Sequence, residues 1–255
     1  MAIDVFHFQL ASQANMYAGI AWCLVRLLTT DDGLHLERVR KEIEHVRDQR
    51  GSSFVTDVTA LGELVYLEAV VIETLRLAQQ SITLRKVLQP CAMRDEDGSD
   101  INVPPGWTIA TLLSITNMDA RGLVRDSDAA VTSSQPTMAA DAAVTAPLAT
   151  FQPERHVRCP DNLSVAASIA QGRLVRREGS DNVLSSTFGH GSHTCPGRSF
   201  ALSISKLVVV MLLQEMELEA QFTTAVVPSS SVGALARVEN ECLVELKRKK
   251  RSVYV

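Results

Sequence analysis

The chain has 255 residues, of which 46% are hydrophobic and 21% charged, so it can bury a core and is not a globally disordered protein. The 25 basic and 29 acidic residues give a net charge of −4, and no basic footprint for nucleic acid is present. The apolar runs stop far short of the roughly 20 residues that span a bilayer, so we expect no transmembrane segment in this chain. Five scattered cysteines favour a reducing compartment, with at most one thiol doing chemistry.

The first third of the chain predicts three helices. Residues 5–28 are mostly apolar with few charges, which is typical of a helix buried on all sides. Because this helix starts almost at once, we expect that the segment covering it upstream is missing. Residues 33–50 combine an apolar stripe with charged faces, as in a surface helix. Residues 60–78 are rich in Leu and Val and predict a third helix, which carries Glu73 and Arg76.

The rest of the chain is less regular. Residues 83–113 hold short apolar runs separated by an Asp-Gly pair and a Pro-Pro-Gly run, as in small antiparallel hairpins. Residues 119–149 are Ala, Asp, Ser and Thr with little periodicity, and we interpret them as a surface loop. Residues 156–186 are irregular again, and a last helix is predicted over 196–213. The residues after this helix are interpreted as turns and short strands. The predicted fold class is mainly α with a minor antiparallel β component.

A glycine-rich loop delivers one cysteine to the start of the last helix. From Phe188 to Gly197 it reads FGHGSHTCPG. Pro196 suits the first helical position, which places Cys195 where the helix dipole and free N–H groups stabilise a thiolate. Gly191 and Gly197 remove side chains where a flat cofactor could approach. A thiolate at this place is a good single ligand for haem iron.

The residues alone leave other interpretations open. His190, His193 and Cys195 are candidate zinc ligands, although their spacing is tight and structural zinc normally takes four ligands. Cys195 is otherwise a buried, inert residue in a glycine-rich turn, as many free cysteines are. Glu73 and Arg76, taken alone, are an ordinary solvated pair on one helix face.

Three motifs, in the same order, resemble those of the cytochrome P450 superfamily. The haem-binding signature of that family, Phe-x-x-Gly-x-[Arg/His]-x-Cys-x-Gly, is matched by Phe188, Gly191, His193, Cys195 and Gly197. Glu73 and Arg76 match its Glu-x-x-Arg helix, and residues 151–155 match its Phe-x-Pro-x-Arg block. Residues 11–15, Ala-Ser-Gln-Ala-Asn, resemble the long distal helix in the branch that holds sterol 7α- and 12α-hydroxylases and prostacyclin synthase.

This resemblance implies a haem-thiolate site. Cys195 would be the axial ligand of the iron of haem b, and Phe188 would pack near the porphyrin. The same loop would contribute Gly191, His193 and Gly197 to the binding of the cofactor. His193 stands where many relatives have an Arg that contacts a propionate. Arg85, twelve residues after Glu73, falls where that branch places a propionate-binding Arg.

The resemblance also implies a structural network and a distal site. Glu73, Arg76 and Arg155 would pair behind the haem loop, where losing one member leaves an uncompensated charge. In the distal helix most relatives carry an acid followed by Thr, which serve proton delivery to dioxygen, whereas this chain has Ala14 and Asn15. An amide hydrogen-bonds but does not relay protons as a carboxylate does, so hydroxylation and rearrangement chemistry both stay open.

The implied parent function is a monooxygenase that inserts one oxygen atom of O2 into a lipophilic substrate such as a sterol or fatty acid. Its electrons would come from NAD(P)H through a reductase or a ferredoxin-type partner. The alternatives are a haem-thiolate isomerase that needs no O2 and a non-catalytic remnant unable to hold haem. The resemblance treats residues 1–255 as one partial domain, the C-terminal part of the family fold. We therefore expect that the N-terminal half with its membrane anchor is absent, and that a eukaryotic parent lies at the endoplasmic reticulum.

Overall fold

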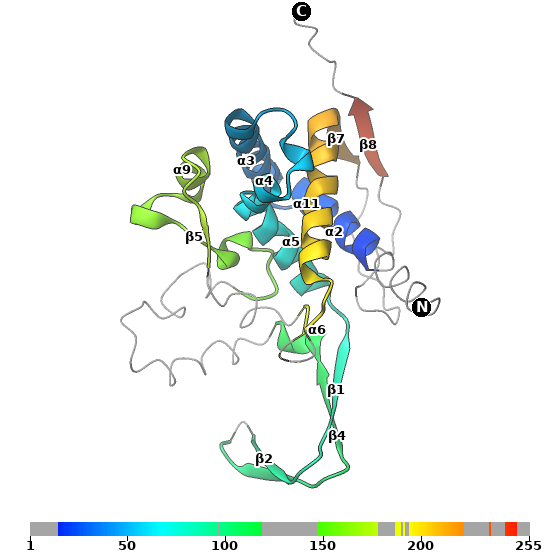
Figure 1. Ribbon diagram of the computed structural model, residues 1–255. Helices are drawn as coiled ribbons and strands as arrows, with labels where there is room; N and C mark the ends of the chain where they lie inside the picture. Colours follow the sequence, from blue (N-terminus) through cyan, green and yellow to red (C-terminus); the bar gives the residue numbers. More distant parts are fainter. Residues whose placement is uncertain are drawn as a thin grey trace, which may run out of the picture.

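A group of packed helices forms the centre of the chain, as the computed structural model shows (Figure 1). The structure describes residues 15–95, 97–118, 147–177, 187–189, 191, 194–221, 235 and 243–248. The main helices are α2 (Met16–Thr29), α3 (Leu34–Arg50), α4 (Val58–Gly62), α5 (Val65–Ala78) and α11 (Arg198–Glu215). Short 3-10 turns join them: η1 (Asp31–Gly33) and η2 (Phe54–Thr56). The helices predicted over 33–50 and 196–213 are confirmed, apart from their ends.

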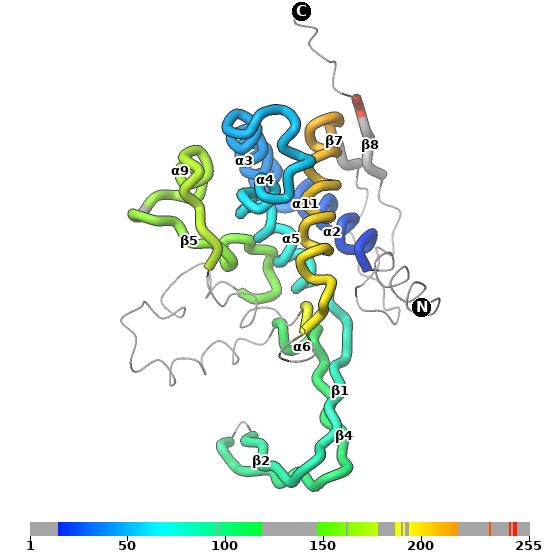
Figure 2. Tube along the Cα trace, in the orientation of Figure 1, coloured from blue at the N-terminus to red at the C-terminus, as the bar shows by residue number. Residues whose placement is uncertain are grey.

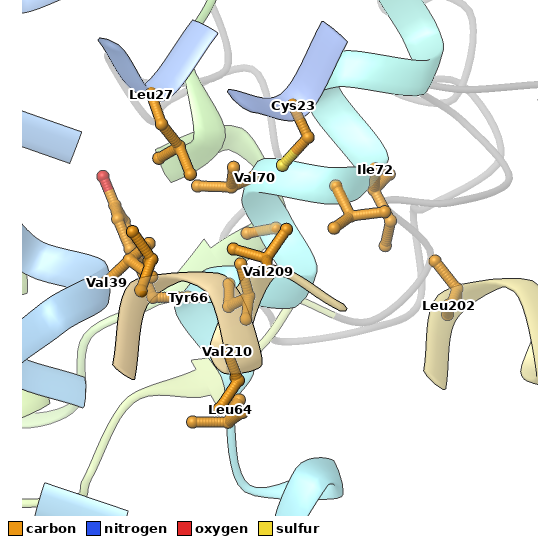
Figure 3. Packing of buried hydrophobic residues seen from close by; sticks show 14 of the residues in the cluster. Cys23, Leu27, Val39, Leu64, Tyr66, Val70, Ile72, Leu202, Val209 and Val210 are labelled. Carbon is orange, nitrogen blue, oxygen red and sulfur yellow. The ribbon is translucent and has the colours of Figure 1, made fainter. Parts of the chain in front are cut away.

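Helix α5 is the centre of the core. Its sequence is apolar on nearly every face, which is the pattern of a helix enclosed on all sides, and α2, α3 and α11 all contact it. Figure 3 shows side chains of α2, α5 and α11 meeting in one cluster, among them Leu27, Val70 and Val209. Two charged residues of α5, Glu73 and Arg76, are fully buried among these apolar neighbours.

Helix α2 confirms part of the first predicted helix. The structure describes it from Met16, whereas residues 5–14 lie outside the described residues. Trp22, Val25 and Leu27 are buried, but Tyr17 is 51% exposed. The expectation that this helix is buried on all sides is therefore wrong for Tyr17, near its described start, while the rest of the helix contacts α3, α5 and α11.

The single helix predicted over residues 60–78 is two helices. Asp57 caps α4 by accepting a hydrogen bond from the backbone N–H of Thr59 at 2.8 Å. The backbone then leaves the helical region at Leu64, where φ is −76° and ψ is 74°, and α5 begins at the next residue. Apolar periodicity alone does not show this break, because the apolar residues continue through it.

The N-terminus of α5 is capped by a side chain from another helix. Glu42 of α3 accepts hydrogen bonds from the backbone N–H groups of Tyr66 at 2.7 Å and Leu67 at 2.9 Å. These are donors of the first helical turn, which no residue of α5 itself can satisfy. Burial raises the pKa of Glu42 to about 7, although both hydrogen bonds act in the opposite direction.

This raised pKa predicts a loss of stability with rising pH. The pKa of Glu42 is 4.5 in the unfolded reference and about 7 in the fold, so the folded chain holds the proton more tightly. The contribution is full below pH 4.5 and is lost as the pH rises through about 7, and it amounts to about 3 kcal/mol. We expect Glu42→Gln to flatten the pH dependence of the unfolding free energy in this window, measured by urea titration. Glu44→Gln, on the exposed side of α3, should keep the wild-type slope, and an equal slope in both variants would contradict the assignment.

Small antiparallel strand pairs complete the fold. β1 (Ile82–Lys86) pairs with β4 (Thr108–Leu112), and β2 (Cys91–Arg94) pairs with β3 (Asp100–Val103). Figure 2 shows this double hairpin running away from the helices. Its turns fall at the Asp-Gly and Pro-Pro-Gly runs, where Gly98 and Gly106 have φ of 84° and 90°. The predicted hairpins are therefore confirmed, and α6 (Leu113–Thr116) follows them.

The C-terminal half contains elements that the sequence did not predict. After η5 (Pro153–His156), the strands β5 (Val157–Arg158) and β6 (Val175–Arg176) pair around η6 (Pro160–Asn162) and α9 (Val165–Ala170). At the end, β7 (Met216–Gln221) pairs with β8 (Leu243–Arg248), in agreement with the short strands expected after the last helix. The mainly α class with minor antiparallel β is confirmed. Only residues 147–149 of the predicted loop at 119–149 are described. In the described part of the chain, none of the helices has the length and apolar character that a membrane crossing requires.

Candidate functional site

Cys195 lies in a closed loop that leads into α11. The backbone N–H of Cys195 donates to the carbonyl of Phe188 at 2.7 Å, and the N–H of Thr194 donates to the carbonyl of Gly191 at 3.1 Å. On the other side, the N–H of Arg198 donates to the carbonyl of Cys195 at 3.2 Å. These bonds join the cysteine both to the start of its loop and to the first residue of the helix.

Helix α11 begins two residues later than predicted. Arg198 is its first residue and Gly197 its N-cap, so Pro196 lies in the turn before the helix and not at its first position. The reason is the bond from Arg198 to Cys195, which closes a turn across Pro196 and Gly197 before helical bonding starts with Ala201 donating to Gly197 at 2.8 Å. Cys195 lies two residues before the N-cap Gly197, on the side of the positive end of the helix dipole.

The loop fits a cofactor that takes one sulfur ligand. The thiol of Cys195 is free and exposed, so its sulfur is open to a ligand. A β-carbon at Gly197 would lie 3.7 Å from this sulfur, at ordinary van der Waals distance. Gly191 has a φ of +60°, and a β-carbon there would meet nothing within 4 Å. Phe188 is half-buried next to the core, with the guanidinium of Arg198 5.9 Å from its ring centre. This donor set suits haem iron held by a thiolate.

The structure describes only some of the other residues predicted for the site. His193 and Ala14 lie outside the described residues, as does His190, on which the zinc alternative depends. Asn15 is the N-cap of α2, and its side chain makes no capping bond. Arg85 is exposed on β1 and donates to the carbonyl of Leu84 at 2.9 Å. Within the described residues, no carboxylate pairs with Arg85 and no contact joins it to Cys195.

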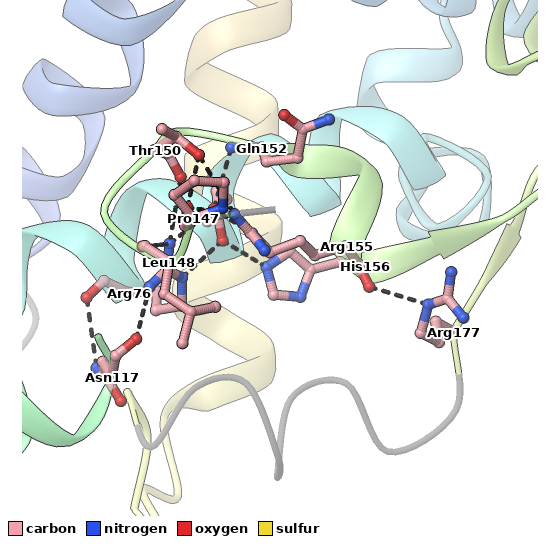
Figure 4. A network of polar contacts seen from close by, with 10 residues as sticks. Arg76, Asn117, Pro147, Leu148, Thr150, Gln152, Arg155, His156 and Arg177 are labelled. Carbon is pink, nitrogen blue, oxygen red and sulfur yellow. Dashed lines mark hydrogen bonds and ion pairs between the residues drawn. The ribbon is translucent and has the colours of Figure 1, made fainter. Parts of the chain in front are cut away.

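The predicted Glu-Arg-Arg network is present and buried. Arg76 donates two bonds of 2.8 Å to the two carboxylate oxygens of Glu73, and Nε of Arg155 lies 3.3 Å from Oε1. His156 Nε2 lies 2.9 Å from Oε2, and the backbone N–H of Gln152 donates to Oε1 at 3.0 Å. Figure 4 shows these side chains converging from α5 and η5. The solvated-pair interpretation is thus wrong, since Glu73, Arg76 and Arg155 are all 0% exposed.

The guanidinium groups also tie distant backbone segments together. Arg76 donates to the carbonyls of Asn117 and Leu148, each at 2.6 Å, and Arg155 donates to the carbonyl of Pro147 at 2.7 Å (Figure 4). The Asn117 amide returns a bond to the Arg76 carbonyl at 3.3 Å. The network therefore fixes both described ends of the stretch between residues 118 and 147.

The charge state of Glu73 follows from its partners. Burial works to raise the pKa of Glu73, but hydrogen bonds and charges from Arg76 and His156 outweigh it and lower this pKa to about 2. Because the folded pKa lies below the unfolded 4.5, the pairing stabilises the fold above pH 4.5 and is lost as the pH falls towards 2.

The sequence did not reveal a second buried network beside the first. Glu154 accepts a hydrogen bond from the hydroxyl of Tyr66 at 2.7 Å and pairs with Arg38. His35 Nδ1 lies 2.7 Å from the same hydroxyl. Burial lowers the pKa of His35, while the charges of Glu154 and Asp31 oppose that change. The only sequence signal for this second network was the position of Glu154. It stands between the Pro and the Arg of the Phe-x-Pro-x-Arg block, next to a residue expected to be buried.

Comparison with known proteins agrees with the motifs. A family model described as Cytochrome P450 matches residues 1–121. Cholesterol 7-alpha-monooxygenase of Cricetulus griseus is 25% identical over 215 residues, which cover 82% of this chain and 36% of that protein. The 7-alpha-hydroxycholest-4-en-3-one 12-alpha-hydroxylase of Oryctolagus cuniculus is 24% identical over 220 residues, covering 85% and 38%. The chain thus spans little more than a third of the length of these relatives.

The fold gives a separate comparison. A crystallised cytochrome P450, CYP102L1, superposes with a TM-score of 0.60 at 18% identity, over 94% of this chain and 44% of that one. The resemblance of residues 11–15 to the sterol 7α- and 12α-hydroxylase branch is consistent with the relatives found. The family model, the relatives, the fold and the order of the motifs all show similarity to the cytochrome P450 superfamily.

Proposed function

We propose that the chain is the haem-holding part of a monooxygenase whose substrate is lipophilic, a sterol or a fatty acid. The observation that carries this proposal is the free, exposed thiol of Cys195 in a loop closed onto Phe188, shortly before α11. The relatives named for cholesterol and cholestenone hydroxylation support the sterol class. For a eukaryotic parent, we place this activity at the endoplasmic-reticulum membrane.

Each site residue has a physical role in this proposal. When bound, haem b supplies the iron at which dioxygen is activated for insertion into the substrate. Cys195 would hold the iron through a thiolate, which the positive end of α11 stabilises. Phe188 would pack on the porphyrin, and Arg85, which has no carboxylate partner among the described residues, would bind a propionate together with His193.

The buried network would keep the loop in place. Glu73, Arg76 and Arg155 join α5 to η5, and Nε2 of Gln79, just after α5, lies 3.4 Å from the carbonyl of Thr187 at the start of the cysteine loop. Electrons would come from NAD(P)H through a reductase or a ferredoxin-type partner.

A haem-thiolate isomerase is the second candidate, and Asn15 leaves it open beside hydroxylation. The amide of Asn15 takes the place of a residue that relays protons to dioxygen in most of the family, and an isomerase does not need that relay. The two candidates share the role of Cys195 and differ in their need for electrons.

The test is turnover with and without an electron donor. The chain is expressed with a haem precursor, and cholesterol is then added with NADPH and a cytochrome P450 reductase, with products identified by mass spectrometry. A hydroxylated sterol that forms only with the complete donor system would support the monooxygenase. Donor-independent conversion to an isomer would support the second candidate, and failure of the chain to hold haem would overturn both in favour of a non-catalytic remnant.

A further inference from the structure

A third, partly buried ion cluster involves the helix that follows Cys195. Lys206 of α11 is only 3% exposed, and its Nζ lies 2.6 Å from Oε2 of Glu68 on α5. Lys206 is eight residues beyond the start of α11, or about 12 Å along the helix axis. A buried lysine is costly unless it is paired, so the contact with Glu68 is a requirement of this packing.

The cluster balances two carboxylates with two cations. Arg176 of β6 donates to both oxygens of Glu68, at 2.6 and 2.9 Å, and to the carbonyl of Gly62 at 2.8 Å. Glu42, the carboxyl that caps α5, is close enough to feel the charge of Lys206. Burial works to raise the pKa of Glu68, but Arg176 and Lys206 outweigh it and lower this pKa. Lys206 and Arg176 thus both bind the carboxylate of Glu68. Only Lys206 lies on α11, so of the two only its bond joins α11 to α5.

Apolar contacts alone do not fix the position of α11 along α5. Leu202, Val209 and Leu213 pack into the core, and this attraction is non-directional and tolerates small shifts of one helix along another. A shift of α11 that separated Lys206 from Glu68 would leave a buried charge uncompensated, so the pair opposes such shifts. Any shift of α11 would also move Cys195, because the carbonyl of Cys195 is bonded to the first N–H of the helix.

We propose that the Lys206–Glu68 pair is a positioning contact for Cys195, holding α11 in the register that sets the place of its sulfur. The proposal rests on the function proposed above in that Cys195 serves as a haem ligand. Lys206 and Glu68 act only through the helix and do not touch the sulfur.

The experiment compares two variants that each remove one cation from the same carboxylate. Lys206→Met removes the ion pair that joins Glu68 to α11 and leaves Glu68 paired with Arg176. Arg176→Met is the matched control, since it leaves Glu68 paired with Lys206. The first readout is hydrogen–deuterium exchange of the amides of Cys195 and Arg198 in the chain without added haem. The second is the share of bound haem that shows the thiolate spectrum after reduction under carbon monoxide.

We expect Lys206→Met to speed exchange at Cys195 and Arg198 about tenfold, which is the effect of about 1.4 kcal/mol of lost local stability. Amides in the middle of α5 should keep their rate, since a general loss of stability would speed them too. The thiolate share of the spectrum should fall in the same variant, and Arg176→Met should leave both readouts unchanged. Equal effects of the two variants, or none in either, would overturn the proposal.

Two further results distinguish a failure of the positioning role from a failure of the proposed function. If Lys206→Met does not fold, Glu68→Gln replaces it, because an uncharged amide no longer compensates the buried charge of Lys206. Exchange at Cys195 should again rise, and no rise would overturn the positioning role. If the wild-type chain shows no thiolate-bound haem, the proposed function fails, whereas the exchange comparison still decides whether Lys206 holds the loop.

Discussion

Replacing Glu73 with alanine is expected to lower the unfolding free energy of the chain by about 3–5 kcal/mol. The change leaves Arg76 and Arg155 as buried cations without their shared carboxylate, in a place that is 0% exposed. Breaking a buried pair in this way costs about 3–5 kcal/mol, against a total stability of about 5–15 kcal/mol for a folded domain. Haem incorporation should fall together with the stability of the fold. Urea unfolding followed by circular dichroism, together with the haem content, measures the effect.

The matched control is a carboxylate in a surface pair. Glu63 pairs with Arg50, and both side chains are well exposed. Glu63→Ala should therefore cost at most about 1 kcal/mol and leave haem incorporation intact. If Glu73→Ala lowers the unfolding free energy no more than Glu63→Ala does, the buried network does not hold the core.

The elements predicted correctly are those whose sequence pattern lies within one short stretch of the chain. The helix over Leu34–Arg50 follows from an apolar stripe with charged faces, and the double hairpin follows from its two turn motifs, where Gly98 and Gly106 take positive φ. The buried network was predicted by family resemblance rather than by periodicity, since Glu73 and Arg76 alone look like a surface pair.

Other features depend on contacts between distant parts of the chain. The break before α5 requires the carboxyl of Glu42, 24 residues away from Tyr66, to bind the new helix start. The pair of Lys206 and Glu68 joins residues 138 positions apart, and that of Tyr66 and Glu154 joins residues 88 apart. No short stretch of the sequence contains both partners of such a pair. The burial of these charged residues was therefore not predictable from local sequence patterns.

Cys195→Ser is expected to have the largest effect on the cofactor. A serine hydroxyl is a poor iron ligand at neutral pH, whereas the thiolate of Cys195 is the soft, charged donor that the proposed site requires. The substitution is nearly isosteric at an exposed position, so the fold should persist while thiolate ligation is lost. Cys91→Ser is the matched control, because Cys91 is also free and exposed but lies on β2, away from α11.

One spectrum tests the ligand assignment most directly. The chain and both serine variants are loaded with haem, reduced under carbon monoxide and compared in the Soret region. We expect the red-shifted band of a thiolate ligand in the wild-type chain and in Cys91→Ser, and its complete absence in Cys195→Ser. An unchanged thiolate band in Cys195→Ser would contradict the account, because another residue would then hold the iron.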